Sequence, residues 1–446
     1  MCVKEKGVAC GLKIKKGDIL LYIGFALIFF NAFSTIPVFV NTGVACYAMI
    51  LFALFLIYMY GADHGRVILY KKRVFAWLLL LLPILYKNYD VKNGSYYQIL
   101  YFYSFFLIMI FLSNREKWAA KAWKIIKIYC TVHFVSGIFL LLNKNILYNY
   151  IIPILYFPEN SSTKRLLYES IDNGYMTGLC NHYSKMGMIM SLGVIAMAGC
   201  IFEKKKDLKK ILVLLLFVVG LGLTGKRGPL LFAIISILIT LYCFSPKKLT
   251  KKQLARILAA IIATVAFFIF AYIKIPQVHQ LVGRFFEGSG DINTLSTGRV
   301  ELFWVKAWGL FRLHPFLGNG WRSFRELVVA LFGNNSSNDA HNIYLQLLAE
   351  VGIVGFTAVV SFMILTWRKT YTLIKEKSAR SDNDSAVVIL KISLCYETFF
   401  MLYGFTGNPL YDMLCYFPYL LCCVIAWSTG QRKKLSNKGA ERQWRK

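Results

Sequence analysis

The feature that most limits the fold of this chain is a series of apolar runs, each close to 20 residues long, divided by shorter polar segments. About 20 apolar residues in an α-helix cross the roughly 30 Å hydrocarbon core of a bilayer. Lipid offers no partners to the backbone, so each spanning segment must bond its peptide groups internally. We therefore predict an all-α polytopic membrane protein in which residues 1–446 form a single domain. The twelve predicted spans are 18–40, 43–60, 74–88, 96–113, 125–143, 185–202, 209–225, 228–246, 254–275, 343–367, 385–405 and 410–428.

The charge of the chain follows from this topology. The sequence has 52 Lys and Arg against 22 Asp and Glu, a formal charge of +30. If the N-terminus is cytoplasmic, the cytoplasmic segments hold 36 of the 52 cations and the outer segments hold 15. This bias is what the positive-inside rule requires, so both termini are predicted to be cytoplasmic. The basic charge is accounted for without nucleic acid, and we expect no nucleic-acid partner.

Two of the predicted outer segments, 144–184 and 276–342, are long, whereas the others are turns. The second lies between the ninth and tenth spans and holds six of the fifteen outer cations, together with His314 and His341. A cation on the outer face runs against the side bias and needs a local reason. We therefore expect the extracytoplasmic loop 276–342 to hold the functional site.

Within this loop the sequence predicts two helices around a sharp turn. The first begins after Ser296 or Thr297, and its apolar positions recur at intervals of three, which is typical of an amphipathic helix on the bilayer surface. The stretch "HPFLGNG" ends it, because proline cannot continue a helix and glycine permits a tight turn. A second helix over about 321–332 is expected to carry Arg322 and Arg325 on one face.

His341 is the titratable residue of the loop that most suggests chemistry. We expect Asn338 or Asp339 to cap the tenth span, which would place His341 in the first helical turn. The positive end of the helix dipole disfavours imidazolium there, so a neutral ring could act as a general base. An interfacial histidine that caps the helix or contacts a lipid headgroup fits the position equally well.

Three stretches of the sequence resemble the O-antigen ligase and O-antigen polymerase family of bacterial cell-envelope enzymes. They are "GRVELFWVKAWGLFRLHPFLGNGWRSF", "AHNIYLQLLAEVGIVGF" and "LTGKRGPLL". The resemblance implies a GT-C-like enzyme of the bacterial cytoplasmic membrane with its active site on the outer face. Such an enzyme takes a glycan from an undecaprenyl diphosphate carrier and joins its reducing end to an acceptor hydroxyl with inversion. The resemblance implies no metal or other cofactor.

Carried over to this sequence, the resemblance assigns His341 as the catalytic base and Arg227 and Arg299 as the diphosphate-binding residues. The chemistry calls for the same residue types, because guanidinium groups bind phosphate oxygens bidentately and do not titrate. Diphosphate is a good leaving group, so one base is sufficient. No C-x-x-C pair indicates a metal site. Further candidate substrate contacts are Lys226, His314, Arg322, Arg325 and Asn342.

The first functional hypothesis is an outer-face polymerase that lengthens a lipid-linked capsular or O-polysaccharide. Its expected partners are the lipid-linked oligosaccharide donor, the glycan acceptor and membrane lipids, with a chain-length regulator and a flippase as protein partners. A ligase that attaches finished glycan to a terminal acceptor uses the same chemistry. Frequent Lys, Ile, Asn and Tyr are typical of an AT-rich genome, such as that of many Gram-positive bacteria. A Gram-positive cell has no lipid A core to accept a finished glycan, and this favours the polymerase over the ligase.

A hypothesis from another class is a twelve-span exporter of sugars or a flippase of lipid-linked glycans. Major-facilitator exporters place their longest connection in the cytoplasm between the sixth and seventh spans, whereas this chain has only "EKKKDLKK" there. Their two halves also repeat, and no repeat is visible here. A flippase would not need the outer histidine and arginines, so both transport functions rank below the enzyme.

Overall fold

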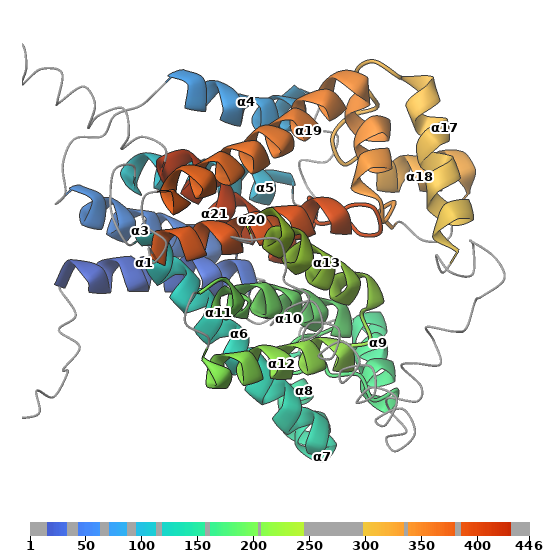
Figure 1. The fold of residues 1–446 in the computed structure, drawn as a ribbon. Coiled ribbons are helices and arrows are strands. Elements are labelled where there is room, and N and C mark those ends of the chain that lie inside the picture. The colour runs from blue at the N-terminus through green and yellow to red at the C-terminus, as the bar shows by residue number, and fades with distance from the viewer. Residues whose placement is uncertain are drawn as a thin grey trace, which may run out of the picture.

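The computed structural model describes residues 16–33, 43–62, 71–86, 95–112, 118–156, 161–203, 207–244, 298–333, 338–379 and 385–429. All regular structure in these ranges is helical (Figure 1). The helices are α1 (Lys16–Phe33), α3 (Gly43–Ala62), α4 (Lys71–Tyr86), α5 (Ser95–Leu112), α6 (Trp118–Leu142), α7 (Lys144–Ile146), η1 (Leu147–Ile151), α8 (Ile152–Leu155), α9 (Ser161–Asp172), α10 (Tyr183–Met197), α11 (Gly199–Phe202), α12 (Leu208–Leu223), α13 (Arg227–Phe244), η2 (Val300–Trp304), α17 (Val305–Leu313), α18 (Phe324–Phe332), α19 (Ile343–Ser378), α20 (Ser385–Tyr403) and α21 (Met413–Thr429).

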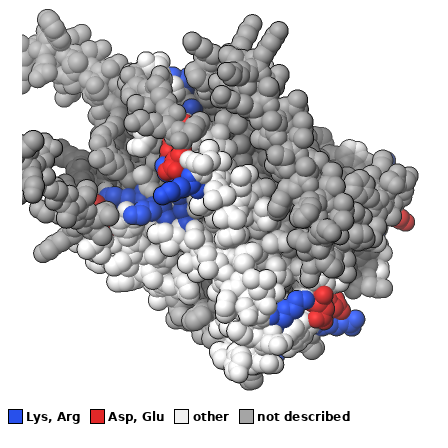
Figure 2. All heavy atoms as spheres, turned by 60° about the horizontal axis from the view of Figure 1, so that its bottom comes forward, with Lys and Arg blue, Asp and Glu red and all other residues white. Residues whose placement is uncertain are grey.

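Helices occupy eleven of the twelve predicted spans, and the ninth, 254–275, lies outside the described residues. The prediction of an all-helical polytopic membrane protein is confirmed, whereas the number of spans and their orientation stay predictions. On the face shown in Figure 2, one group of charged side chains lies at the centre-left and another at the lower right, with uncharged surface between these two groups. Five helical segments in the described ranges are long and apolar enough to cross a membrane, namely Trp118–Leu142, Tyr183–Phe202, Arg227–Phe244, Ile343–Ser378 and Ser385–Tyr403.

The helix α10 lies inside the bundle. Its apolar stretch is 83% buried in protein, compared with 22% for α13, so α10 is enclosed by other helices while α13 keeps an outer face. Glycines let neighbours approach it closely, since a Cβ at Gly193 would lie 2.5 Å from the ring of Phe217 on α12. A Cβ at Gly187 would lie 2.7 Å from Cγ of Lys226, so this glycine makes room for the stem of a predicted site residue.

The tenth predicted span, α19, is broken at Gly352, whose φ of 61° and ψ of −170° are not helical. A regular helix would bond the N–H groups of Ile353 and Val354 to the carbonyls of Ala349 and Glu350. Here all four groups are bonded to the turn "HPFLGNG" instead, so none of them is left unsatisfied. The bonds run from Ile353 N to Pro315 O at 2.9 Å, from Val354 N to Phe316 O at 3.2 Å, from Asn319 N to Ala349 O at 3.2 Å and from Gly320 N to Glu350 O at 2.7 Å.

This exchange of hydrogen bonds depends on two glycines with positive φ. A Cβ at Gly352 would lie 2.3 Å from the carbonyl oxygen of Phe316, and a Cβ at Gly318 would lie 2.3 Å from that of Glu350. Both contacts are with backbone, which cannot move aside as a side chain can. The turn and the broken helix therefore fix each other, and Figure 1 shows α17 and α18 standing beside the first part of α19.

The second helix of the outer loop differs from the prediction in its start. The first helical turns, η2, follow Arg299, while Ser296 and Thr297 lie outside the described residues. The second helix begins at Phe324, so the prediction that Arg322 shares a helical face with Arg325 was wrong. Arg322 has a φ of 61° because its N–H turns inward to donate to Oε2 of Glu350 at 2.9 Å.

The predicted apolar stripe of the first outer helix is exposed. Leu302, Val305 and Trp308 are 48%, 62% and 50% exposed, while the opposite positions Phe303 and Ala307 pack into a small outer core with α18 and α19. An apolar stripe that faces away from the protein suits a bilayer surface. That location remains a prediction.

Candidate functional site

His341 lies just before α19 rather than in its first turn. The predicted caps Asn338 and Asp339 were wrong, because Asn342 is the N-cap, with its Oδ1 accepting from the N–H groups of Tyr344 at 3.0 Å and Leu345 at 3.1 Å. His341 itself has a φ of 52°, which is unusual for a residue with a side chain. Such a conformation persists only where the surroundings hold it, and it is found more often at functional sites.

The electrostatic setting of His341 keeps its ring neutral. Burial, followed by the positive charge of Arg299 and more weakly that of Lys226, lowers its pKa to about 4 against the opposing effect of Asp339. The expected neutral state is therefore supported, although the main cause is burial beside cations and not the helix dipole. The ring is half-buried, with the edge of Phe303 at a centroid distance of 6.2 Å.

Arg299 and Lys226 come from segments far apart in the sequence and act on the same histidine. Arg299 precedes η2, and its Nη1 donates to the carbonyl oxygen of Thr406 at 2.8 Å. Lys226 stands in the turn before α13 with its Nζ 4.7 Å from the ring centre of Tyr183. Burial, and then the charge of Arg299, lowers the pKa of Lys226 to about 8. Two partly desolvated cations therefore lie near a neutral imidazole.

Arg227 and His314 occupy different positions relative to this cluster. Arg227 is the half-buried first residue of α13 and directly follows Lys226. His314 is exposed at the far end of α17. The helical stretch between Arg299 and His314 is roughly 20 Å long at 1.5 Å per residue, so the structure does not bring His314 to the other site residues.

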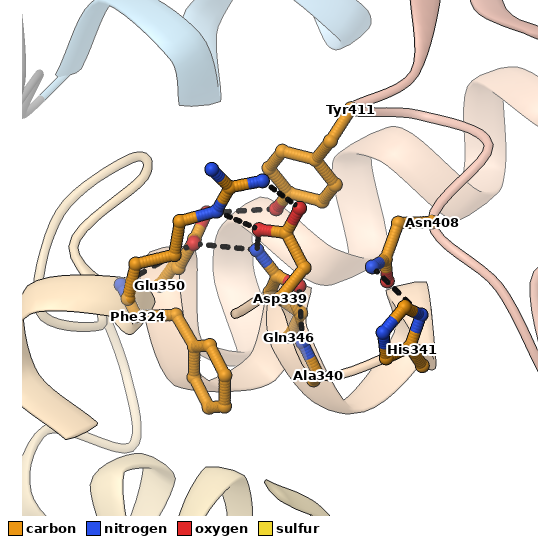
Figure 3. A network of polar contacts seen from close by, with 9 residues as sticks. Phe324, Asp339, Ala340, His341, Gln346, Glu350, Asn408 and Tyr411 are labelled. Atoms are coloured by element: carbon orange, nitrogen blue, oxygen red, sulfur yellow. Dashed lines mark hydrogen bonds and ion pairs between the residues drawn. The ribbon is translucent and has the colours of Figure 1, made fainter. Parts of the chain in front are cut away.

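The remaining predicted contacts belong to a polar network beside His341 (Figure 3). Nε of Arg325 donates to Oδ1 of Asp339 at 2.8 Å, and its Nη2 pairs with the second carboxylate oxygen. This bidentate pair holds the pKa of Asp339 below its usual range, against burial. Nε2 of Gln346 donates to Asp339 at 3.1 Å and to Glu350 at 3.0 Å.

Glu350 is the fully buried centre of this network. Its carboxylate accepts from Tyr411 Oη at 2.7 Å, from Arg322 N at 2.9 Å and from Gln346. The ring of Tyr411 in turn stacks on Trp321 at 5.2 Å. Arg322, Arg325 and Asn342, predicted as substrate contacts, thus all make contacts that shape the backbone around His341.

Residues 211–360 match the family model described as O-antigen ligase. The matched stretch runs from α12 into α19 and includes Lys226, Arg227, Arg299 and His341. This part of the chain therefore resembles the O-antigen ligase family. The resemblance seen in the three sequence motifs is thereby confirmed, and with it a general role as a membrane enzyme of the O-antigen ligase and polymerase type. A comparison with curated proteins finds no match.

Sequence reasoning missed the loop 404–412 between α20 and α21, which lies beyond the matched residues. Two main-chain carbonyl oxygens of this loop bind residues of the site. Gly404 O accepts a hydrogen bond from Ile343 N at 2.9 Å, and Thr406 O accepts one from Arg299. Asn408 contacts His341. The only signal in the sequence is a Gly- and Pro-containing stretch, "GFTGNPLYD", between two apolar runs.

Sequence reasoning also missed two further groups near Lys226. His182 caps α10, its Nδ1 accepting from Ser184 N at 3.1 Å, and burial followed by Lys226 and Lys185 lowers its pKa to about 4. Asp412 is a buried carboxylate whose pKa is raised by burial against the opposing charges of Lys185 and Lys226. In the described residues, no group of three His, Cys, Asp or Glu side chains is arranged to hold a metal ion.

Proposed function

We propose that this protein is a polymerase that works at the outer face of the bacterial cytoplasmic membrane. It transfers glycan from an undecaprenyl-diphosphate-linked oligosaccharide to an acceptor hydroxyl of another repeat unit, inverting and without a metal. The observation that supports this most is the convergence of neutral His341 with the two cations Arg299 and Lys226, drawn from three separate segments. Attachment of finished glycan to a terminal acceptor is the alternative that uses the same site.

The proposed step assigns each group one task. His341 removes the proton from the acceptor hydroxyl, and the oxygen forms a bond to the anomeric carbon of the donor sugar. The bond between that carbon and the diphosphate oxygen breaks, and the electron pair leaves with the diphosphate. Arg299 and Lys226, with Arg227 as the second predicted arginine, stabilise the negative charge that develops on the phosphate oxygens. Their partial desolvation strengthens this interaction compared with cations in bulk water.

The test is reconstitution of the purified protein with one defined polyprenyl-diphosphate oligosaccharide as both donor and acceptor. A polymerase yields a ladder of longer lipid-linked glycans, a ligase yields none without a separate acceptor, and a transporter moves the unchanged lipid across the vesicle membrane. His341→Ala is expected to abolish the ladder while leaving the protein inserted. A full ladder from His341→Ala would remove this residue as the base.

The diphosphate contact has its own paired variants. Arg299→Lys keeps the charge but loses the planar fork that binds two phosphate oxygens, so a large loss of ladder is expected. Arg312→Lys is the matched control, since Arg312 is an exposed arginine on the adjoining α17. If both variants keep full activity, Arg299 does not bind the diphosphate bidentately.

A further inference from the structure

Asn408, in the loop 404–412, and His341, just before α19, face each other, and hydrogen bonds fix the backbone of both segments. Figure 3 shows the two side chains pointing at one another, and Nδ2 of Asn408 lies 3.5 Å from Nδ1 of His341. The loop that carries Asn408 is tied on one side through Thr406 O to Arg299 and on the other through Tyr411 Oη to Glu350. The main-chain carbonyl oxygen of Asn408 also accepts hydrogen bonds from the N–H groups of Tyr411 and Asp412, both at 3.0 Å.

The histidine side is fixed equally well. Its neighbour Ala340 donates its N–H to Gln346 Oε1 at 3.0 Å, and its other neighbour, Asn342, caps α19. These bonds hold His341 in its positive-φ conformation, which a residue with a side chain rarely adopts. The two backbone segments that carry the imidazole and the amide therefore cannot separate without breaking several of these bonds.

One rotation of the Asn408 amide meets two hydrogen-bonding needs at once. A neutral imidazole carries one proton, and if Nε2 is to act as a base the proton must be on Nδ1. A proton on Nδ1 needs an acceptor, and Asn408 is the group that faces this nitrogen. Oδ1 of Asn408 is buried without a hydrogen-bond partner among the described residues. The oxygen and nitrogen of an asparagine amide differ only by a half-turn about the last side-chain bond.

We propose that Asn408 is the positioning residue of His341, with its amide oxygen accepting the proton on Nδ1 so that Nε2 is left free to take the proton of the acceptor hydroxyl. The proposal rests on the proposed role of His341 as base. It gives the loop 404–412, which lies outside the matched family region, a direct part in the reaction. The long contact of 3.5 Å is expected to shorten when substrate is bound, as catalytic hydrogen bonds commonly do.

The charged groups that act on His341 set the background for a test by pH. They are Arg299 beside η2, Lys226 before α13, Asp339 before α19 and Arg325 on α18. Replacing Asn408 by Asp adds one negative charge against Nδ1 and leaves these four in place. The carboxylate favours imidazolium, so the acid limb of kcat and the titration of His341 should both move to higher pH.

The first measurement needs no variant. In protein carrying ¹⁵N-labelled histidine, the resonances of His341, assigned by their loss in His341→Gln, report which ring nitrogen bears the proton. A proton on Nδ1 is expected. A proton on Nε2 overturns the proposal, whether or not the protein transfers glycan.

The variants then test the consequence for the reaction. Asn408→Ala is expected to lower kcat about 10- to 100-fold, as loss of an orienting partner commonly does, with little change in KM. Asn408→Asp is expected to keep more activity than Asn408→Ala and to shift the acid limb upward. Asn143→Asp, which adds the same charge at an exposed asparagine after α6, should change neither.

The two proposals fail in different ways. Wild-type kcat in Asn408→Ala, or an unshifted His341 titration in Asn408→Asp, overturns the positioning role even if the polymerase is active. An inactive wild-type protein in which Asn408→Asp still shifts the His341 titration refutes the proposed function but leaves the contact established.

Discussion

Replacing Gly352 by alanine tests the exchange of hydrogen bonds between the broken helix and the turn. The backbone at this position has φ 61° and ψ −170°, a region that side chains disfavour by about 1–3 kcal/mol. The added Cβ would also lie 2.3 Å from the carbonyl oxygen of Phe316, so the two backbone segments must separate by about 1 Å to reach ordinary contact. At least the bonds of Ile353 N and Val354 N would weaken, at about 0.5–1.5 kcal/mol each. We expect a total loss of about 2–6 kcal/mol.

Gly333 provides a matched control. It has a similar φ of 64° at the end of α18, but a Cβ there would meet nothing within 4 Å. Gly333→Ala should therefore cost only the backbone strain, about 1–2 kcal/mol. The difference between the two variants isolates the close approach of the two segments from the strain of a positive φ.

Thermal unfolding in detergent, followed with a thiol-reactive dye, compares the variants directly. Most of the cysteines in the described ranges are buried and unpaired, so their reaction reports opening of the bundle. The midpoint of Gly352→Ala should fall several degrees below that of Gly333→Ala. Equal midpoints would show that the turn and the broken helix are not fixed against each other, and the reasoning would fail.

Three other predictions follow from the same site. Glu350→Ala leaves the buried Tyr411 hydroxyl without its acceptor, at about 1–3 kcal/mol, and removes one of the two acceptors of Gln346. Its melting midpoint should therefore lie below that of Glu350→Gln, which keeps one carbonyl oxygen. Because the pKa of His341 is about 4, transfer activity should stay level as the pH falls from 7.5 to about 5 and should decline only toward pH 4. A decline centred near pH 6.5 would mean that the base is an ordinary, exposed histidine. Below pH 6.5 His341 becomes protonated in the unfolded chain, whereas in the folded protein it stays neutral down to about pH 4. The free energy of unfolding should therefore decrease by at most about 3 kcal/mol as the pH falls through this window. In melting curves, His341→Gln should reduce this dependence of stability on pH.

The site residues that the sequence revealed are those within recognisable motifs. His341, Arg299 and the Lys226–Arg227 pair stand in stretches whose residue types suit transfer from a lipid diphosphate, and the structure places three of these four side chains in one electrostatic cluster. Which of two adjacent cations faces His341 depends on how the turn before α13 is directed. That direction is set by packing on Gly187 of α10, which lies some 40 residues earlier in the chain.

The cap of α19 shows why local pattern was insufficient. The stretch "SSNDAHN" contains several residues that make good N-caps, and their chemistry alone does not rank them. Asp339 is taken by the bidentate pair with Arg325, which leaves Asn342 as the cap and moves His341 out of the helix. The decisive partner is on α18, and no rule of sequence spacing predicts that contact.

The sequence by itself determined the helical, membrane-spanning class and the position of most helices, because apolar runs of that length have one stable arrangement in lipid. It also identified the glycines of the turn as a break in regular structure, whereas the break of α19 at Gly352 became visible only in the structure. Only the tertiary structure decided that these breaks satisfy each other's backbone groups, that burial beside cations keeps His341 neutral, and that the loop 404–412 completes the site. These properties arise from contacts between segments distant in the chain, where the strength of each interaction depends on how much water the neighbouring segment excludes.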